Sequence, residues 1–352
     1  MTTFPTDAPV LVTGATGYVA GWLVKELLDA GLTVHAAVRD PERRKKTGHL
    51  QDIAENSPGT LRLFRADLLE DGSYAEAIAG CSVVFHTASP FTTTVRDPQR
   101  ELIDPAVKGT RNVLETAART PSVKRVVVTS SCAAIYTDAI DCSKAPGGKL
   151  TEEVWNTTAS LDYQPYSYSK TLAEQEAWKI TEAQDQFKLV TVNPSLVIGP
   201  ALNPRPTSES FNIIRQMGDG TMKRGAPKLG LGVVDVRDLA KAHMEAGFRE
   251  DAKGRHIVSG HNTNILELCK VLVEKYGDRY PLPRQSLPKW IVWLAGPIAG
   301  GISRKFVTNN VDVKWRADNS KSKRALGVTY RPMKVSMEEM FQQMIDAGAF
   351  GK

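Results

Sequence analysis

The first half of the chain alternates short apolar strands with segments of helical periodicity, and this alternation constrains the fold more than any other feature. The first strand covers residues 10–13, and a helical pattern of apolar side chains follows it as far as Gly31. Further strands are predicted at residues 33–39, 61–67, 83–88, 124–130 and 189–193, with a helix at 107–117. Apolar strands separated by helices indicate a parallel sheet covered on both faces. We therefore predict an α/β fold with a doubly wound Rossmann sheet.

The regular alternation of strands and helices stops after Gly199, where a proline-rich break covers residues 199–206. Helical patches and loops follow, and residues 233–243 look like a return to the first lobe. We predict a Rossmann domain over residues 1–199, joined by 232–260. A smaller, mostly helical substrate-binding lobe would contain residues 200–231 and 261–352.

Residues 290–301 form the most apolar stretch of the second lobe. The stretch is shorter than the roughly 20 apolar residues that a membrane span needs. It is compatible with an interfacial segment, an oligomer contact or a lid over a pocket. We favour a buried or pocket-lining helix.

Composition narrows the classes of function. The net charge of +6, from 45 basic and 39 acidic residues, is mild and comes with no nucleic-acid-binding motif. The six histidines show no metal-ligand spacing, so we predict no metal. The four cysteines form no C-x-x-C pair, and no signal peptide is visible before the first strand. These features favour a cytoplasmic protein without nucleic-acid or membrane-spanning parts.

A glycine-rich turn, Thr-Gly-Ala-Thr-Gly-Tyr-Val-Ala, joins the first strand to the first helix at residues 13–20. Glycines let the backbone turn tightly and approach a pyrophosphate, and the helix start offers free N–H groups. A plain strand–helix turn also uses glycine, but the position at the first junction favours a dinucleotide site. The contacts predicted here are Gly14, Thr16, Gly17, Tyr18 and Val19.

The end of the second strand indicates which dinucleotide binds. NAD-specific sites usually carry an acid there, bonded to the ribose 2′-hydroxyl. This chain has Arg39, followed by the basic run 43–46. A guanidinium pairs with a 2′-phosphate, so we predict NADP(H). Asp40, directly after Arg39, counts against this prediction, and the basic residues could instead be an ordinary solvated helix start.

Tyr166 and Lys170 form a Tyr-x-x-x-Lys pattern at the head of a predicted helix. They would lie one turn apart on one face, where the ammonium would lower the pKa of the phenol. Alone, the pair is better explained by an ordinary amphipathic helix. A serine of the sequence Thr-Ser-Ser-Cys at 129–132, at the end of the fifth strand, reverses this balance only together with the glycine-rich turn and Arg39. Such a hydroxyl can bind a substrate carbonyl oxygen while the phenol protonates it and hydride arrives at carbon.

Together these motifs resemble the extended or atypical short-chain dehydrogenase/reductases. More narrowly, the chain is similar to the dihydroflavonol reductases, cinnamoyl-CoA reductases and yeast methylglyoxal/isovaleraldehyde reductases. The resemblance runs from Val10 to about Pro332. It also rests on residues 66–68, 85–91, 193–200 and 235–240.

The resemblance implies roles for individual residues. Ser131, the second serine, matches the catalytic one, Tyr166 the acid and Lys170 its partner. Arg39 matches a ligand of the 2′-phosphate, with either Arg43 or Lys46 as the second. Further cofactor contacts would come from Asp67, Leu68, Thr87, Ala88, Ser89, Thr129, Pro194, Ser195 and Val197. Phe91, Cys132 and Tyr136 would line the substrate pocket. Asn112 would hold a structural water or a backbone segment, or is only an exposed helix residue, and His86 is expected to be packed rather than a base.

Two departures limit what the resemblance implies about the substrate. The flavonoid reductases carry an asparagine where this chain has Tyr136, and a signature of the cinnamoyl-CoA reductases is absent. We therefore predict reversible, NADPH-dependent reduction of aldehydes or ketones with an apolar substituent, by a monomer or homodimer. A hydroxysteroid dehydrogenase or a sugar-nucleotide epimerase is the alternative on the same fold. A dinucleotide-sensing regulator is a third reading, disfavoured because both Tyr166 and Lys170 are present.

Overall fold

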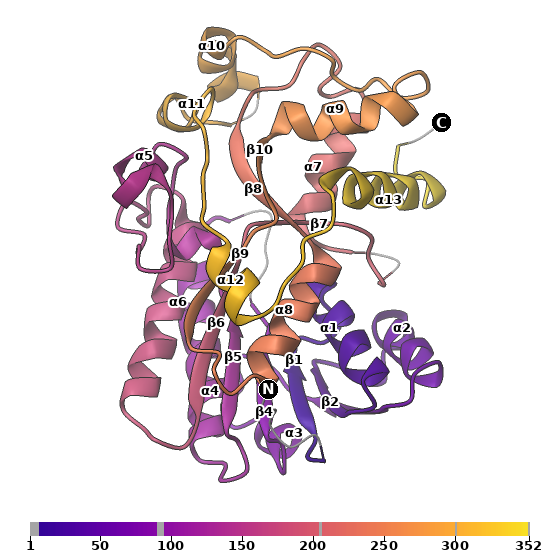
Figure 1. Ribbon diagram of the computed structural model, residues 1–352, viewed down its shortest axis with the longest axis vertical. Helices are drawn as coiled ribbons and strands as arrows, with labels where there is room; N and C mark the ends of the chain where they lie inside the picture. The colour runs from indigo at the N-terminus through magenta and orange to yellow at the C-terminus, as the bar shows by residue number, and fades with distance from the viewer. Residues whose placement is uncertain (1–6, 90–94, 204–205, 300, 351–352) are drawn as a thin grey trace.

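A seven-stranded parallel sheet forms the centre of the larger lobe in the computed structural model, which describes residues 7–89, 95–203, 206–299 and 301–350 (Figure 1). Its strand order is β3-β2-β1-β4-β5-β6-β9. The strands are β1 (Val10–Thr13), β2 (Thr33–Val38), β3 (Thr60–Arg65), β4 (Val83–His86), β5 (Arg125–Thr129), β6 (Lys188–Pro194) and β9 (Gly254–Val258). The doubly wound fold is thereby confirmed, and each of the six predicted strands lies within two residues of its predicted bounds.

Helices cover both faces of this sheet (Figure 1). One face packs against α1 (Tyr18–Asp29), α2 (Arg44–Glu55) and α8 (Val236–Phe248). The other packs against α3 (Ala75–Ile78), α4 (Asp104–Ala118) and α6 (Pro165–Glu182). Apart from the edge strand β3, whose residues are exposed or half-buried, the strands are rich in buried valine and leucine, as expected for a sheet covered on both sides. The strand order reverses between β1 and β4, so the crevice beyond their carboxyl ends is the expected ligand site.

A second sheet, in the order β10-β8-β7, belongs to the smaller lobe. Its strands are β7 (Leu196–Ile198), β8 (Gly230–Asp235) and β10 (His261–Asn264), and they pack with α7 (Glu209–Gly218), α9 (Ile265–Tyr276) and α13 (Met333–Asp346). Residues 233–243 were expected to return together to the first lobe, but they are divided between the second sheet and a helix on the main sheet. β8 pairs within the second sheet, whereas α8 packs on α1 against the main sheet. The predicted lobe boundaries stay a prediction.

Seven short helices connect these layers in the described part of the chain, and in Figure 1 α10 and α11 lie at the upper end of the molecule, with α5 at the left below them and α12 near the middle. They are η1 (Gln99–Ile103), η2 (Cys132–Ala134), α5 (Asp141–Lys144), η3 (Pro146–Gly148), α10 (Lys289–Ala299), α11 (Arg304–Asn310) and α12 (Ser320–Ala325). Among the described residues, no helix is both long and apolar enough to cross a bilayer.

The prediction of a buried helix at residues 290–301 is wrong, while its pocket-lining alternative stays a prediction. α10 packs on α11, where the Ile302 amide donates to the Gly296 carbonyl at 3.1 Å and Val307 is buried. Only one side of α10 packs against α11. Trp290 and Ile298, on the other side, are 66% and 91% exposed. Hydrophobicity alone could not show that the packing partner covers a single side of the helix.

Candidate active site

The glycine-rich turn lies at the carboxyl end of β1, with its backbone against β4. Gly14 has a φ of +63°, and a Cβ on it would come within 2.9 Å of the Ala88 Cα, so glycine is required on both counts. The Thr13 hydroxyl fixes the approach by accepting from the Ala88 amide at 3.1 Å. Thr87 contributes a second link by donating to the Thr13 carbonyl.

The start of α1 fits the pyrophosphate of a dinucleotide. Gly17 is the residue before the helix and has no side chain to cap the first-turn amides, which include that of Val19. Such amides form an anion site together with the helix dipole. The Tyr18 side chain points elsewhere, because its hydroxyl donates to the Gly199 carbonyl at 2.5 Å. Tyr18 therefore offers only its backbone, while the Thr16 carbonyl accepts from Asn203 at 3.3 Å.

The predicted 2′-phosphate ligands lie at the end of β2 and the start of α2. Arg39 directly follows β2, Arg43 precedes α2, and Lys46 is in its first turn; all three are exposed. The Asp40 carboxylate accepts from the Glu42 amide at 3.2 Å and so forms part of a local turn. This arrangement fits a phosphate placed between β2 and α2, and it leaves both Arg43 and Lys46 as candidates for the second ligand.

Asn112 holds the loop that follows β3, the segment predicted to flank the adenine. Its side-chain amide donates to the carbonyls of Leu68 and Glu70 at 3.2 and 2.9 Å, and its oxygen accepts from the Gly72 amide at 3.2 Å. The residue is 6% exposed, which rules out the exposed-helix alternative and agrees with the backbone link. Asp67 stabilises the same loop by accepting from the Leu69 amide at 2.9 Å.

Ser131, Tyr166 and Lys170 come together from β5 and α6. Ser131 precedes η2, where its hydroxyl accepts from the Ala133 amide at 3.1 Å and hydrogen-bonds the Tyr166 phenol. Pro165 starts α6 with a preset φ, which places Tyr166 in the first turn. The Lys170 ammonium donates to the Ser89 hydroxyl at 3.0 Å and lies 6.0 Å from the centre of the Tyr166 ring. The three predicted catalytic side chains therefore share one site with the end of β4.

The protonation of this site differs from the prediction. Burial raises the pKa of Tyr166, and the hydrogen bond with Ser131 opposes the shift. Since 46% of the Tyr166 surface is exposed, solvent screens this effect. Burial lowers the pKa of Lys170 to about 8, against the attraction of Glu174. The expected lowering of the tyrosine pKa by Lys170 is not found, because the ammonium contacts Ser89 and loss of hydration dominates at both groups.

A small cleft lies beside Lys170. Its lining includes several predicted cofactor contacts, namely Leu68, Ala88, Ser89 and Thr129, together with His86 and Glu174. His86 is buried and lies 3.0 Å from the Thr13 hydroxyl; burial lowers its pKa to about 3, so it is a packed histidine rather than a base. The Thr129 hydroxyl lies 2.7 Å from Nε2 of His243.

The predicted nicotinamide end lies where β6 passes into β7. Pro194 ends β6 and is buried, while Val197 lies in β7 and is half-buried. Between them, the buried Ser195 hydroxyl has no hydrogen-bond partner among the described residues. Such a group fits a polar atom of a bound cofactor. The unpaired hydroxyl, the open start of α1 and the basic cluster together fit NADP(H).

Comparison with known proteins identifies the family. Residues 10–260 match the model of the NAD dependent epimerase/dehydratase family. The chain belongs to this family. It is 37% identical over 338 residues to cinnamoyl-CoA reductase CAD2 of Medicago truncatula, covering 95% of each chain. It is 41% identical over 286 residues to a putative anthocyanidin reductase of Ginkgo biloba, covering 78% of this chain and 82% of that protein.

Solved structures agree with these relatives. Yeast methylglyoxal/isovaleraldehyde reductase Gre2 in complex with NADPH has a TM-score of 0.77 and 26% identity, covering 97% of this chain and 99% of that one. The predicted resemblance to the extended short-chain dehydrogenase/reductases is confirmed, and the chain is a reductase of this family.

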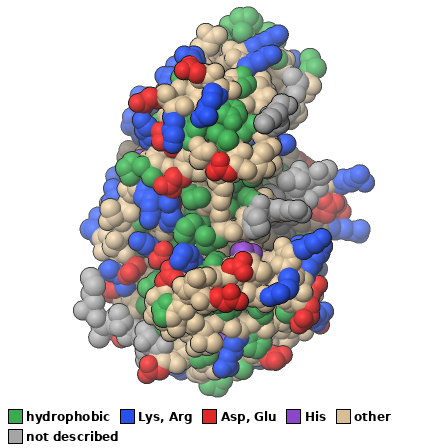
Figure 2. Space-filling view, turned by 90° about the vertical axis from the view of Figure 1, so that its right-hand side faces the viewer, with side chains coloured by type: hydrophobic (Ala, Val, Ile, Leu, Met, Phe, Trp, Pro, Cys, Tyr) green, Lys and Arg blue, Asp and Glu red, His purple; other side chains and the backbone are tan. Residues whose placement is uncertain are grey.

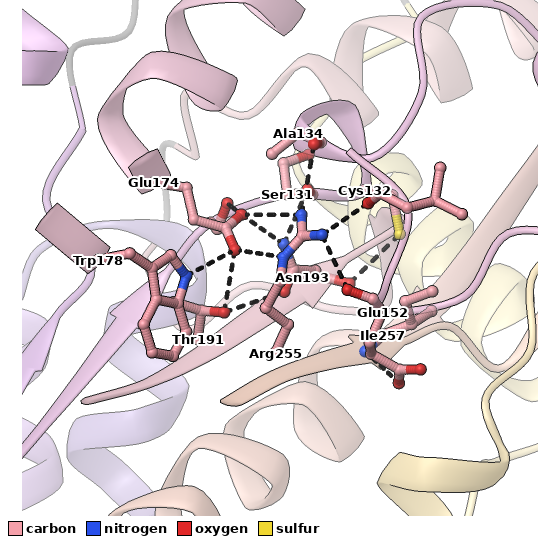
Figure 3. A network of polar contacts seen from close by, with 12 residues as sticks. Ser131, Cys132, Ala134, Glu152, Glu174, Trp178, Thr191, Asn193, Arg255 and Ile257 are labelled. Atoms are coloured by element: carbon pink, nitrogen blue, oxygen red, sulfur yellow. Dashed lines mark hydrogen bonds and ion pairs between the residues drawn. The ribbon is translucent and has the colours of Figure 1, made fainter. Parts of the chain in front are cut away.

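A buried ion pair beneath the site of this reductase was missed by sequence reasoning (Figure 3). Arg255 from β9 donates through Nε to the Glu174 carboxylate at 2.6 Å, and the two side chains are 7% and 0% exposed. Asn193 donates to the same carboxylate at 2.8 Å and to the Ser131 carbonyl at 3.2 Å. The Ser130 hydroxyl also donates to Glu174, which explains why Ser131, and not Ser130, reaches Tyr166. The pair thus supports the backbone that carries Ser131.

The three residues predicted to line the substrate pocket differ in their surroundings. Phe91 lies outside the described residues. Cys132 is 2% exposed and its thiol donates to the Asn193 carbonyl at 3.3 Å, so it belongs to the core below the site rather than to an open pocket. Tyr136 is half-buried, with its ring centre 5.6 Å from that of Trp315. Among the described residues, no group of three or more His, Cys, Asp or Glu side chains is placed to hold a metal ion.

Proposed function

We propose that this reductase is an NADPH-dependent carbonyl reductase that converts aldehydes or ketones to alcohols and can run in reverse. The observation that carries the proposal is the meeting of Ser131, Tyr166 and Lys170 beside the carboxyl ends of β4 and β5. The glycine-rich turn and the helix start beyond it supply the anion site that a dinucleotide needs.

The choice of NADP(H) rests on the charges after β2. Arg39 is the first ligand proposed for the 2′-phosphate, with Arg43 or Lys46 as the second. The amides at the start of α1 would hold the pyrophosphate, and Ser195 with Val197 would contact the nicotinamide end. When bound, the cofactor supplies the hydride that reaches the carbonyl carbon. The relative Gre2 was crystallised with NADPH, which supports this choice.

Proton transfer is assigned to Tyr166. A phenol with a raised pKa stays protonated near neutral pH, so it can donate its proton to the substrate oxygen as that oxygen gains charge. Ser131, which hydrogen-bonds the phenol, would hold the same oxygen. Lys170 would hold the cofactor ribose and, as an ammonium, return a proton towards the phenol after each turnover.

A tyrosine-to-phenylalanine exchange tests this assignment. Tyr166→Phe removes the proton donor and keeps the ring, so we expect kcat to fall at least about a hundredfold. The Kd for NADPH, measured by quenching of protein fluorescence, should stay within about threefold. Turnover is followed by NADPH absorbance with a panel of aldehydes and ketones. Full activity of the variant would refute the proton-donor role, and release of oxidised cofactor with simple ketones distinguishes this reaction from that of an epimerase.

A further inference from the structure

The exposed side of α10 gathers hydrophobic side chains that have no structural use within the described part of the chain. The described part of the chain exposes nine large hydrophobic residues. Five of them fall between residues 290 and 302: Trp290, Trp293, Leu294, Ile298 and Ile302. The first four recur at helical spacing and therefore lie along one side of α10. We call Trp290, Trp293, Leu294 and Ile298 the apolar face of α10. Exposed apolar groups gathered in this way mark an interaction surface.

The chain segment that contains this face is basic. Residues 279–311 contain no aspartate or glutamate, and they contain Arg279, Arg284, Lys289, Arg304 and Lys305. Arg304 and Lys305, at the start of α11, are exposed, and the Arg304 guanidinium lies 4.5 Å from the centre of the Trp293 ring. Figure 2 shows hydrophobic and basic side chains next to one another at the upper end of the molecule, where Figure 1 places α10 and α11, with acidic side chains also present there. A partner for this surface must satisfy both properties.

A second copy of the chain fits this surface poorly. A two-fold symmetric contact through α10 would bring the basic group of one copy against the same group of the other. Like charges facing each other across an interface are repulsive, and this segment supplies no acidic residue to balance them. An anionic lipid surface has the opposite charge and an apolar interior. Tryptophans prefer the level of the lipid headgroups, and basic residues are attracted to anionic lipids.

We propose that the apolar face of α10 docks on the surface of an anionic membrane. Trp290 and Trp293 would enter the headgroup region and Arg304 would contact lipid phosphates. The exposed Lys305, which lies against the Tyr163 ring, would add to the positive charge near them. The contact is peripheral, since no described helix is both long and apolar enough to span a bilayer.

This contact would also orient the active site. Lys305 of α11 lies 3.7 Å from the centre of the Tyr163 ring, in the segment that leads into α6. Asn310 donates at 2.6 Å to Asp138, in the segment that follows η2. α10 and α11 are therefore fixed to segments adjoining Ser131 and Tyr166. Under the proposed function, apolar carbonyl compounds dissolved in the bilayer would be close to this side of the enzyme; the docking itself does not depend on that function.

Vesicle binding by the full chain tests the proposal. We expect the protein to sediment with vesicles of phosphatidylcholine containing about 30% phosphatidylserine, less with phosphatidylcholine alone, and less as salt is raised. Tryptophan emission should shift to the blue on binding. The double variant Trp290→Ser/Trp293→Ser should lower the partition coefficient at least about tenfold. The double variant Arg304→Glu/Lys305→Glu should lower the partition coefficient by about fivefold or more for each of its two substitutions.

Matched controls separate the surface from general effects. Val335→Ser changes another exposed hydrophobic residue, on α13. Arg119→Glu/Lys124→Glu makes the same change in charge at the opposite end of the sheet, before β5. Both should bind vesicles like the unchanged protein, and all variants should keep their circular dichroism spectrum and their turnover of a water-soluble aldehyde.

Four outcomes would overturn the proposal. The first is an absence of binding to the phosphatidylserine vesicles at low salt. The second is binding that the tryptophan variant leaves unchanged. A third is concentration-dependent dimerisation that the tryptophan variant abolishes without any vesicle binding, which would assign the surface to a second copy. The last is a changed KM for a soluble carbonyl compound without vesicle binding, which would make α10 a lid.

Discussion

Arg255→Met removes one partner of the buried ion pair beneath the active site, and its effect can be worked out from the contacts. The side chain of Arg255 donates to the Glu174 carboxylate and to the carbonyls of Glu152 and Val154, at 2.6, 2.9 and 2.6 Å. Without it, a carboxylate of 0% exposure loses its ion-pair partner, and only the attraction of the Lys170 ammonium remains. Breaking a buried pair in this way costs about 3–5 kcal/mol. Because Ser130, Thr191 and Asn193 still donate to Glu174, we expect about 3 kcal/mol.

The measurement is urea unfolding, followed by tryptophan fluorescence and by circular dichroism. Both probes are needed because coincident transitions justify a single free energy of unfolding for a chain of 352 residues. Glu174→Gln is the matched variant, since it removes the charge and keeps the shape. The double variant Glu174→Gln/Arg255→Met should be less destabilised than the sum of the two single variants, by at least about 1 kcal/mol.

The same variants test whether the pair positions Ser131, the serine proposed to be catalytic. Glu174 acts through Asn193, which donates to the Ser131 carbonyl. We therefore expect Arg255→Met to lower kcat about tenfold or more and to leave the KM for NADPH within about threefold. Additive losses of stability, or a loss below about 1 kcal/mol for Arg255→Met, would refute the pair as a coupled unit. A changed KM with an unchanged kcat would refute its positioning role.

Five further variants test the proposed cofactor site and the lysine. Arg39→Asp should raise the KM for NADPH by about 10–100-fold and change that for NADH by less than about threefold, since a charge-assisted contact with the phosphate is lost. Equal changes in the two KM values would refute the cofactor choice. Comparing the KM for NADPH of Arg43→Ala with that of Lys46→Ala identifies the second phosphate ligand. Because the pKa of Lys170 is lowered to about 8, its ammonium is lost as pH rises through that value, so kcat/KM for reduction should fall there. In Lys170→Arg the fall should move to higher pH, since an arginine stays charged, and an unmoved profile would assign the fall to another group. Asn112→Ala should raise the KM for NADPH about tenfold, equivalent to about 1.4 kcal/mol, by releasing the loop after β3; an unchanged KM would show that the loop does not contact the cofactor.

The sheet could be predicted closely because its signals are local. Each strand is a short apolar run ended by a turn, and Gly14 lies where the backbone needs a positive φ and no Cβ. The meeting of Ser131 with Tyr166 followed from the rule that parallel strands end at one edge. Asn112 had two sequence interpretations, and only the three-dimensional placement of the loop after β3 decided between them.

Other features depend on contacts that leave no local pattern. Glu174 follows Lys170 by one helical turn, which is a weak signal, but its partner Arg255 is 81 residues away on β9. The exposure of α10 depends on how little of it α11 covers. Cys132 follows the catalytic serine directly, so neighbourhood in sequence suggested the pocket, whereas η2 turns its thiol into the core. In each case long-range packing determined the side-chain environment.

The protonation states of Tyr166 and Lys170 bear on whether the site favours reduction of a carbonyl or oxidation of an alcohol. The sequence suggested an ammonium that helps the phenol lose its proton, which suits oxidation of an alcohol. In the structure burial opposes charge on both groups, so the phenol holds its proton more firmly and the ammonium holds its own less firmly. An acid that is protonated at neutral pH is ready to protonate a carbonyl oxygen, and a lysine with a pKa of about 8 can replace that proton. Under the proposed function, these directions fit reduction near neutral pH and oxidation of the alcohol at more alkaline pH, with the effect at Tyr166 weakened because 46% of its surface is exposed.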